Sequence, residues 1–152
     1  GVLNLGTEGQ AGLGALAAGV TAPRIDLVTT RWRPVDSGPW PIAVEPGEPH
    51  TLDDVITEVV GPLAERIGDD FSLSRTVLDG NIASAVFGAV TMLRRLGAAG
   101  ADRAIGAALG SLDQGPLHGT GTVDGGFVRA SCCLYYRLPG GGYCGDCVLA
   151  AR

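Results

Sequence analysis

The apolar residues between positions 51 and 112 recur every three or four residues, which is the spacing of one face of a helix. This pattern predicts three helices, over about residues 51–67, 73–96 and 101–112. The body of the chain is therefore expected to be mainly helical.

Capping and helix-breaking residues place the ends of these helices. Thr51 is expected to cap the first helix, because its hydroxyl can accept from a free N–H of the first turn. Gly61-Pro62 is expected to interrupt that helix, since proline lacks the N–H that the helix needs. Asp79-Gly80-Asn81 marks an expected break in the second helix, and Gly115-Pro116 ends the third.

The N-terminal third has a different pattern. Residues 25–33 are rich in β-branched and aromatic side chains and predict a strand, and residues 40–45 predict a second, shorter strand of the same hairpin. Pro39 and Pro41 place the second strand at a sheet edge, where a missing N–H is tolerated. A glycine-interrupted helix is expected over residues 7–20.

After Pro116, glycines punctuate short extended pieces, and residues 127–138 predict a strand that the turn 139–142 ends. The fold class is α+β: a mainly helical body with a small antiparallel hairpin and a cysteine-rich C-terminal hairpin. We expect a single domain over residues 1–152, divided into a body at 1–118 and a cysteine-bearing segment at 119–152.

Composition and charge exclude several classes of protein. Hydrophobic residues form 45% of the 152, which excludes general disorder. The net charge of −5 makes nucleic acid an unfavourable partner. No run of 18 apolar residues is uninterrupted, so no membrane span is expected. The chain begins at Gly1 without methionine, which is compatible with a processed or truncated start.

All four cysteines lie close together, as Cys132-Cys133, ten intervening residues, Cys144, two residues and Cys147. Four thiolates are the right number for one metal centre. Consecutive side chains on a strand point to opposite faces, so Cys132 and Cys133 can share a centre only where the backbone bends. The glycines at 140–142 and 145 are expected to bring N–H groups near the sulfurs.

Spacing alone leaves iron–sulfur and zinc about equally supported. A gap of zero between two ligands is rare in zinc sites. Two disulfides would need an oxidising compartment, which nothing in the sequence indicates. A thioredoxin-like site would need a neighbouring βαβ unit, and the pattern predicts none.

Residues 129–147 resemble the C-terminal signature of the FhuF-type ferric-siderophore reductases, including the serine before the pair, the Tyr-Tyr-Arg run and the Pro-Gly-rich turn. Two shorter segments resemble the same family: residues 80–84, and the hairpin containing Trp32-Arg33-Pro34 and Gly38-Pro39. The resemblance implies that Cys132, Cys133, Cys144 and Cys147 hold one [2Fe-2S] cluster.

The resemblance further implies an oxidoreductase that passes one electron to siderophore-bound Fe(III) and releases Fe(II). It places the protein in the cytoplasm, either free or at the periphery of the inner membrane. The electron donor would be a ferredoxin or a flavin reductase. Two alternatives remain open: a structural zinc-binding module, and an iron–sulfur carrier or sensor without a siderophore site.

Charge bears on the substrate. Residues 1–123 carry a net charge of −6 and residues 124–152 a net charge of +1. A cluster with four thiolates is itself negative, so a neutral or cationic ferric hydroxamate is a better partner than an anionic ferric catecholate. Arg129, Arg137 and Tyr136 are the candidate substrate contacts, with solvated strand residues as the alternative interpretation of the two arginines.

Overall fold

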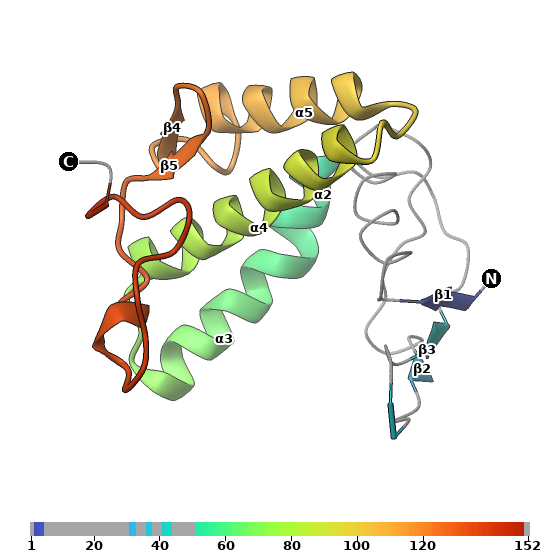
Figure 1. Ribbon diagram of the computed structural model, residues 1–152. Helices are drawn as coiled ribbons and strands as arrows, with labels where there is room; N and C mark the ends of the chain where they lie inside the picture. Colours follow the sequence, from blue (N-terminus) through green and yellow to red (C-terminus); the bar gives the residue numbers. More distant parts are fainter. Residues whose placement is uncertain (1, 5–30, 33–35, 38–40, 44–50, 151–152) are drawn as a thin grey trace. The chain divides into compact units, whose positions relative to one another are not determined.

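The computed structural model describes residues 2–4, 31–32, 36–37, 41–43 and 51–150 (Figure 1). The chain divides into two compact units, the first with residues 1–55 and 89–108 and the second with residues 56–88 and 109–152. The fold is α+β, mainly helical with small antiparallel sheets, as predicted. The single domain with its boundary near residue 118 stays a prediction, and the expected helix over 7–20 lies outside the described residues.

The first unit contains a three-stranded antiparallel sheet of β1 (Val2–Asn4), β2 (Arg31–Trp32) and β3 (Pro41–Ala43). β2 and β3 pair with Trp32 opposite Ile42, which confirms the hairpin. The predicted edge position of β3 is wrong, because β1 pairs along its other side and makes β3 central. Pro41 is the first residue of β3, where the absence of an N–H is tolerated.

The first unit also contains α2 (Leu52–Val55), whose cap is reciprocal. The Asp54 N–H donates to Thr51 Oγ1 at 3.1 Å, and the Thr51 N–H donates to Asp54 Oδ2 at 2.8 Å. Two N–H groups of the helix start are thereby satisfied, which confirms the predicted cap. Among the described residues of this unit, the buried apolar side chains are Val90, Leu93, Ala104 and Ala108.

The second unit begins with the π-helix η1 (Ile56–Val60), followed directly by α3 (Gly61–Phe71). Pro62 is the second residue of α3 and directly follows the π-helical turn, where the hydrogen-bond pattern of the helix changes. The predicted interruption at Gly61-Pro62 is confirmed as this change from π to α geometry. Ser72 ends α3 in the left-handed conformation, with a φ of 53°.

Two longer helices follow, α4 (Arg75–Arg95) and α5 (Ala101–Gln114). The predicted break at 79–81 is wrong, because α4 runs through it without interruption. Asp79 pairs with Arg75 one turn earlier at 2.7 Å, and Arg75 also reaches Glu65 of α3 at 2.9 Å. These pairs occupy polar groups that would otherwise compete with the helix. α5 ends directly before Gly115, as predicted.

Among the described residues, α4 is the one helix long and apolar enough to cross a membrane by length and composition. The same properties suit the core helix of a soluble protein, so the finding is weak evidence for a span. Asp79 and Asn81 of this helix are engaged with Arg75 and Arg129, which is how polar groups of a packed helix are satisfied.

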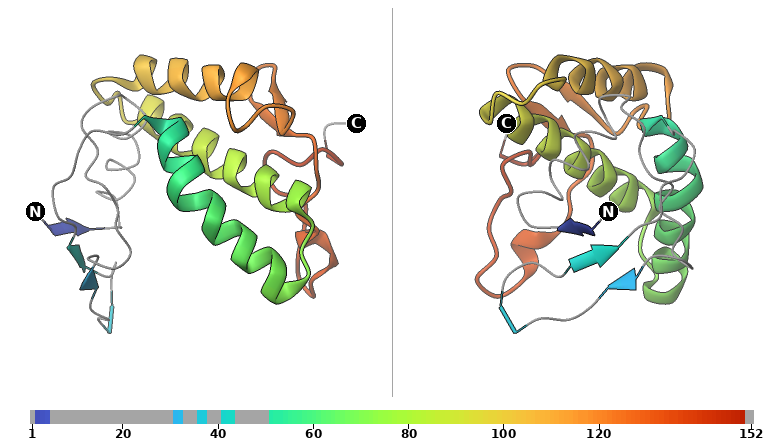
Figure 2. Two further views of the ribbon diagram at one scale, coloured as in Figure 1. Left: turned by 180° about the vertical axis from the view of Figure 1, so that it is seen from behind. Right: turned by 90° about the vertical axis from the view of Figure 1, so that its right-hand side faces the viewer.

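The C-terminal segment contains the antiparallel hairpin β4 (Gly121–Val123) and β5 (Phe127–Arg129), then the short 3₁₀ helix η2 (Tyr135–Arg137). Figure 2 shows this segment passing beside the end of α4 that carries Arg75. The predicted strand over 127–138 is therefore too long, because the backbone bends at Ser131. Phe127 stacks on Phe87 of α4 with ring centroids 4.4 Å apart, which anchors the hairpin to the helix.

The buried apolar residues of the second unit come from helices and from the C-terminal segment alike: Ile56, Ala64, Leu78, Ala83, Phe87, Leu117 and Cys147. Ser111 and Arg129 are buried with them. A guanidinium in such a core must be paired, because an isolated buried charge is strongly unfavourable.

Candidate metal centre

The backbone leaves the strand before the adjacent cysteines, as their spacing predicts. Cys132 to Leu134 have no regular secondary structure, and Leu134 has a left-handed φ of 64°. This conformation costs an L-residue of this size about 1–2 kcal/mol. It lets the Leu134 N–H turn back to Cys132 Sγ at 3.4 Å. Strain is thus held directly beside the cysteine pair.

A tight turn then returns the chain toward the second pair of cysteines. The Gly141 N–H donates to the Leu138 carbonyl at 2.8 Å, and a Cβ at Gly141 would collide with the carbonyl oxygen of Tyr135. The Cys147 N–H donates to the Cys144 carbonyl at 3.1 Å and closes the Cys-x-x-Cys turn. These contacts show why the turn needs glycine at position 141.

The four thiols form a chain of neighbours. Cys133 Sγ lies 3.7 Å from Cys144 Sγ, and the Cys147 thiol interacts with those of Cys144 and Cys132. All four cysteines are free, and 3.7 Å is far beyond the ~2.05 Å of a disulfide bond. Cys147 is 4% exposed, whereas the other three are partly exposed.

Arg129, the last residue of β5, directs its guanidinium into this group of thiols. Its side chain is 4% exposed. Nη1 donates to Asn81 Oδ1 at 2.7 Å, Nη2 donates to Cys144 Sγ at 2.6 Å, and Nε lies 3.0 Å from Asp146 Oδ2. The burial of Arg129 contradicts both sequence-based interpretations, a substrate contact and a solvated strand residue.

Sequence reasoning missed Asp146 and underestimated Asn81. Asp146 lies between Cys144 and Cys147, and its backbone carbonyl accepts from the Arg129 N–H at 3.0 Å as well. Asn81 lies in residues 80–84 of α4, and the resemblance of this segment to the family is the sequence signal that could have indicated its role. Ser131 Oγ donates to the Thr76 carbonyl of α4 at 2.9 Å, and a Cβ at Gly80 would collide with that hydroxyl.

The surroundings lower the pKa values of some of the thiols and raise that of another. A hydrogen bond from the Tyr135 backbone lowers the pKa of Cys133, and the Arg129 guanidinium acts in the same direction. Burial raises the pKa of Cys144 to about 11, with Cys133 and Asp146 adding to the effect. Burial acts to raise the pKa of Cys147. Its pKa is nevertheless lowered overall by hydrogen bonds from the backbone of Leu149 and Ala150 and by the thiols of Cys144 and Cys132.

The N–H groups nearest the sulfurs therefore belong to Leu134, Tyr135, Leu149 and Ala150. Glycines were expected in this role. Gly141 instead uses its N–H to close the turn on Leu138. Backbone N–H groups directed at thiolates stabilise their negative charge, whichever residue supplies them.

Four thiols in one segment are the donor set that a [2Fe-2S] cluster requires. In the part of the chain that the structure describes, no group of three or more Cys, His, Asp or Glu residues is placed to hold one ion. Two thiolates on one tetrahedral metal with bonds of about 2.3 Å lie about 3.8 Å apart. Cys133 Sγ and Cys144 Sγ are 3.7 Å apart and would therefore suit two ligands of one metal. Cys147 has the thiols of Cys144 and Cys132 as its neighbours.

Exposed aromatic residues flank the cysteines. Tyr136 and Tyr143 lie with ring centroids 6.0 Å apart, and the Arg137 guanidinium is 5.8 Å from the Tyr136 ring. Tyr143 is 62% exposed. Large exposed side chains in the same segment are Leu134, Tyr135 and Leu138. Tyr136, Arg137 and Tyr143 form what we call the aromatic cluster, a solvent-facing site beside the thiols.

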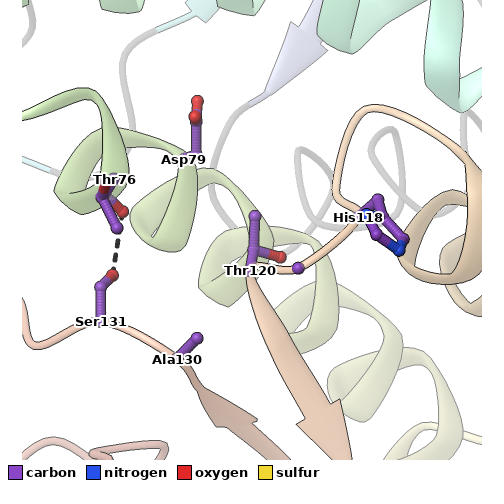
Figure 3. A pocket seen from close by; sticks show the side chains of 7 residues that line it. Thr76, Asp79, His118, Thr120, Ala130 and Ser131 are labelled. Atoms are coloured by element: carbon purple, nitrogen blue, oxygen red, sulfur yellow. Dashed lines mark hydrogen bonds between the residues drawn. The ribbon is translucent and has the colours of Figure 1, made fainter.

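A small pocket lies next to the cysteine-bearing segment (Figure 3). It is lined by Thr76 and Asp79 of α4, by residues 118–120 and by Ala130 and Ser131. Its volume of about 210 Å³ is below the usual 300–1,000 Å³ of pockets for drug-sized ligands. A ferric siderophore is at least as large as such ligands, so it does not fit inside this pocket.

Residues 129–149 match the family model of the FhuF 2Fe-2S C-terminal domain. No curated protein and no solved structure matches the chain. The matched segment begins at Arg129 and contains all four cysteines. This match identifies a [2Fe-2S] cluster as the cofactor of the segment, in agreement with the four neighbouring thiols.

Proposed function

We propose that this protein is a ferric-siderophore reductase, in which Cys132, Cys133, Cys144 and Cys147 hold the [2Fe-2S] cluster. The observation that carries the proposal is the gathering of four free, neighbouring thiols within the segment that matches the FhuF 2Fe-2S domain. A resident redox centre beside exposed aromatic side chains supports electron transfer to a docked partner.

The bound cluster supplies a one-electron couple. Siderophore oxygens are hard ligands that hold Fe(III) tightly and Fe(II) much less tightly, so a single electron is enough to release the metal. The protein needs no general acid or base for this step. Its task is to bring the siderophore complex close to the thiols and to keep the cluster assembled.

The aromatic cluster is the proposed docking site for the substrate. Tyr136 and Tyr143 offer ring faces, and Arg137 adds one positive charge. Arg137 and Tyr136 therefore remain substrate contacts in this proposal, whereas Arg129 does not. The net charge of −5 still favours a neutral or cationic ferric hydroxamate over a ferric catecholate.

The electron would come from a ferredoxin or a flavin reductase, and the reaction would take place in the cytoplasm, either free or at the periphery of the inner membrane. The partial exposure of Cys132, Cys133 and Cys144 supports an encounter with such a donor. The siderophore and the donor can then use the same surface in turn.

The decisive experiment is anaerobic reduction of the purified protein, followed by a panel of ferric siderophores. We expect ferric hydroxamates to re-oxidise the cluster, with Fe(II) captured by a ferrous chelator. Faster reaction with a ferric catecholate would overturn the hydroxamate preference. A colourless sample with stoichiometric zinc would indicate a structural zinc module. A brown sample that dithionite bleaches but no siderophore re-oxidises would indicate a carrier or sensor.

Variants of the docking site separate substrate binding from cluster assembly. Arg137→Gln and Tyr136→Leu should each slow siderophore reduction severalfold, because each variant loses a cation–π or charge interaction with the substrate. Both variants should keep the full content of iron and sulfide. Arg66→Gln is the matched control, since Arg66 is 76% exposed on α3 and pairs with Asp70. Equal rates in all three variants would contradict docking at the aromatic cluster.

Variants of the thiols test the ligand set itself. Replacing any one cysteine with alanine removes one of four ligands, so we expect loss of acid-labile sulfide and of visible absorbance in each case. A variant that retains the complete cluster would show that its cysteine is not a ligand. Arg66→Gln again controls for handling losses during purification.

A further inference from the structure

We propose that Arg129 is a buried cationic donor to Cys144 that raises the reduction potential of the cluster and draws the added electron to the iron shared by Cys133 and Cys144. The inference rests on the cysteine ligands of the proposed function. It assigns a role to Arg129, Asn81 and Asp146 and places the electron within the centre.

Arg129 is a permanent positive charge in a buried position. A guanidinium does not lose its proton in proteins. Its Nε lies 3.0 Å from the Asp146 carboxylate. The side chain is 4% exposed, so water screens the charge little.

This charge lies directly against the thiols. Nη2 donates to Cys144 Sγ at 2.6 Å. Cys133 Sγ and Cys144 Sγ are 3.7 Å apart, the separation of two ligands on one metal. Arg129 therefore acts on the ligands of one iron.

Reduction of a [2Fe-2S] cluster held by these cysteines would add one negative charge, supplied by an external one-electron reductant, and would require no change of bonds or protons. The added negative charge is stabilised most where a cation and hydrogen-bond donors face the ligands. This favours the iron of Cys133 and Cys144 and makes reduction easier.

Two further residues hold the guanidinium in place. Asn81 of α4 accepts from Nη1 at 2.7 Å, and Asp146 lies 3.0 Å from Nε. Asp146 is separated from Cys144 by one residue, and its negative charge opposes that of Arg129. Arg129 and Asp146 should thus shift the potential in opposite directions, which a purely structural role would not do.

The experiment is a potentiometric titration of the full chain with its cluster, using dithionite and dye mediators and no siderophore. Arg129→Gln should lower the reduction potential by at least the 59 mV that corresponds to a tenfold change for one electron. Arg129→Lys, which keeps the charge, should recover part of this shift. Asp146→Asn should raise the potential. Arg66→Gln changes the net charge by the same amount without touching a thiol, and should leave the potential unchanged.

Should Arg129→Gln fail to assemble a cluster, Asp146→Asn and Asn81→Asp decide the question. Asn81→Asp adds a negative charge beside the guanidinium and should lower the potential. Equal reduction potentials in Arg129→Gln and Arg66→Gln would overturn the proposal. A lower reduction potential in Asp146→Asn would also overturn it.

The position of the electron is tested by serine ligands. A serine oxygen is harder than a thiolate sulfur and favours Fe(III), so it lowers the potential most on the iron that is reduced. Cys144→Ser should lower the potential and change the electron paramagnetic resonance spectrum of the reduced protein more than Cys147→Ser. The reverse order would overturn the assignment. Because no siderophore is present, these results stand or fall apart from the reductase activity.

Discussion

Asn81, in the N-terminal third of helix α4, accepts a hydrogen bond of 2.7 Å from Nη1 of Arg129, which lies 48 residues further along the chain. The bond ties the helix to the segment that carries the four thiols. A neighbouring contact, from Ser131 Oγ to the Thr76 carbonyl at 2.9 Å, joins the same two parts. α4 is therefore the support of the candidate metal centre.

Replacing Asn81 with alanine should weaken this support. The substitution leaves Nη1 of a buried guanidinium without its acceptor, which costs about 1–3 kcal/mol of unfolding free energy. Urea denaturation of the cluster-loaded protein measures the loss. Gln114→Ala is the control, because the Gln114 amide donates to the exposed Asp113 at 3.2 Å. Equal stability of the two variants would contradict a supporting role for Asn81.

Replacing two glycines of α4 with alanine should have different effects on the stability of the protein. At Gly80 an added Cβ collides with Ser131 Oγ, so the hydroxyl must move and its bond to Thr76 is lost. At Gly88 an added Cβ meets nothing within 4 Å. Gly88→Ala should gain up to about 1 kcal/mol from helix propensity, whereas Gly80→Ala should show no gain or a loss. Thermal unfolding compares them, and an equal gain in both variants would show that Ser131 does not pack against position 80.

The turn between the cysteine pairs offers a second comparison. Gly141→Ala places a Cβ against the Tyr135 carbonyl, a backbone atom that cannot rotate away. Gly142→Ala meets nothing within 4 Å. We expect Gly141→Ala to lower cluster occupancy severalfold and Gly142→Ala to keep it. Iron and acid-labile sulfide content measure this, and full occupancy in Gly141→Ala would show that the turn tolerates a side chain.

The stacked rings of Phe87 and Phe127 should contribute to stability as a pair. Their planes are 5° apart and their centroids 4.4 Å apart. A double-mutant cycle with Phe87→Leu and Phe127→Leu should give a coupling free energy of about 0.5–1.5 kcal/mol. Denaturant titration of the four proteins measures it. Strict additivity would mean that the hairpin and the helix pack independently at this point.

Sequence periodicity determined the three central helices, because helix formation depends on local spacing and on capping residues such as Thr51. The count and spacing of the cysteines indicated a metal centre, and the bend that the adjacent pair requires is present at Leu134. Local chemistry is sufficient for these features, since neighbours in the chain supply them.

Only the tertiary structure decided the surroundings of the thiols. The sequence pattern predicts that Arg129 is an exposed strand residue. In the structure it is buried, and contacts with Asn81, Asp146 and Cys144 compensate its positive charge. The unbroken course of α4 past Gly80 and the central place of β3 depend in the same way on distant partners. A sequence pattern records which groups a residue can bind, whereas folding selects the partner, because burial makes an unpaired polar group unfavourable.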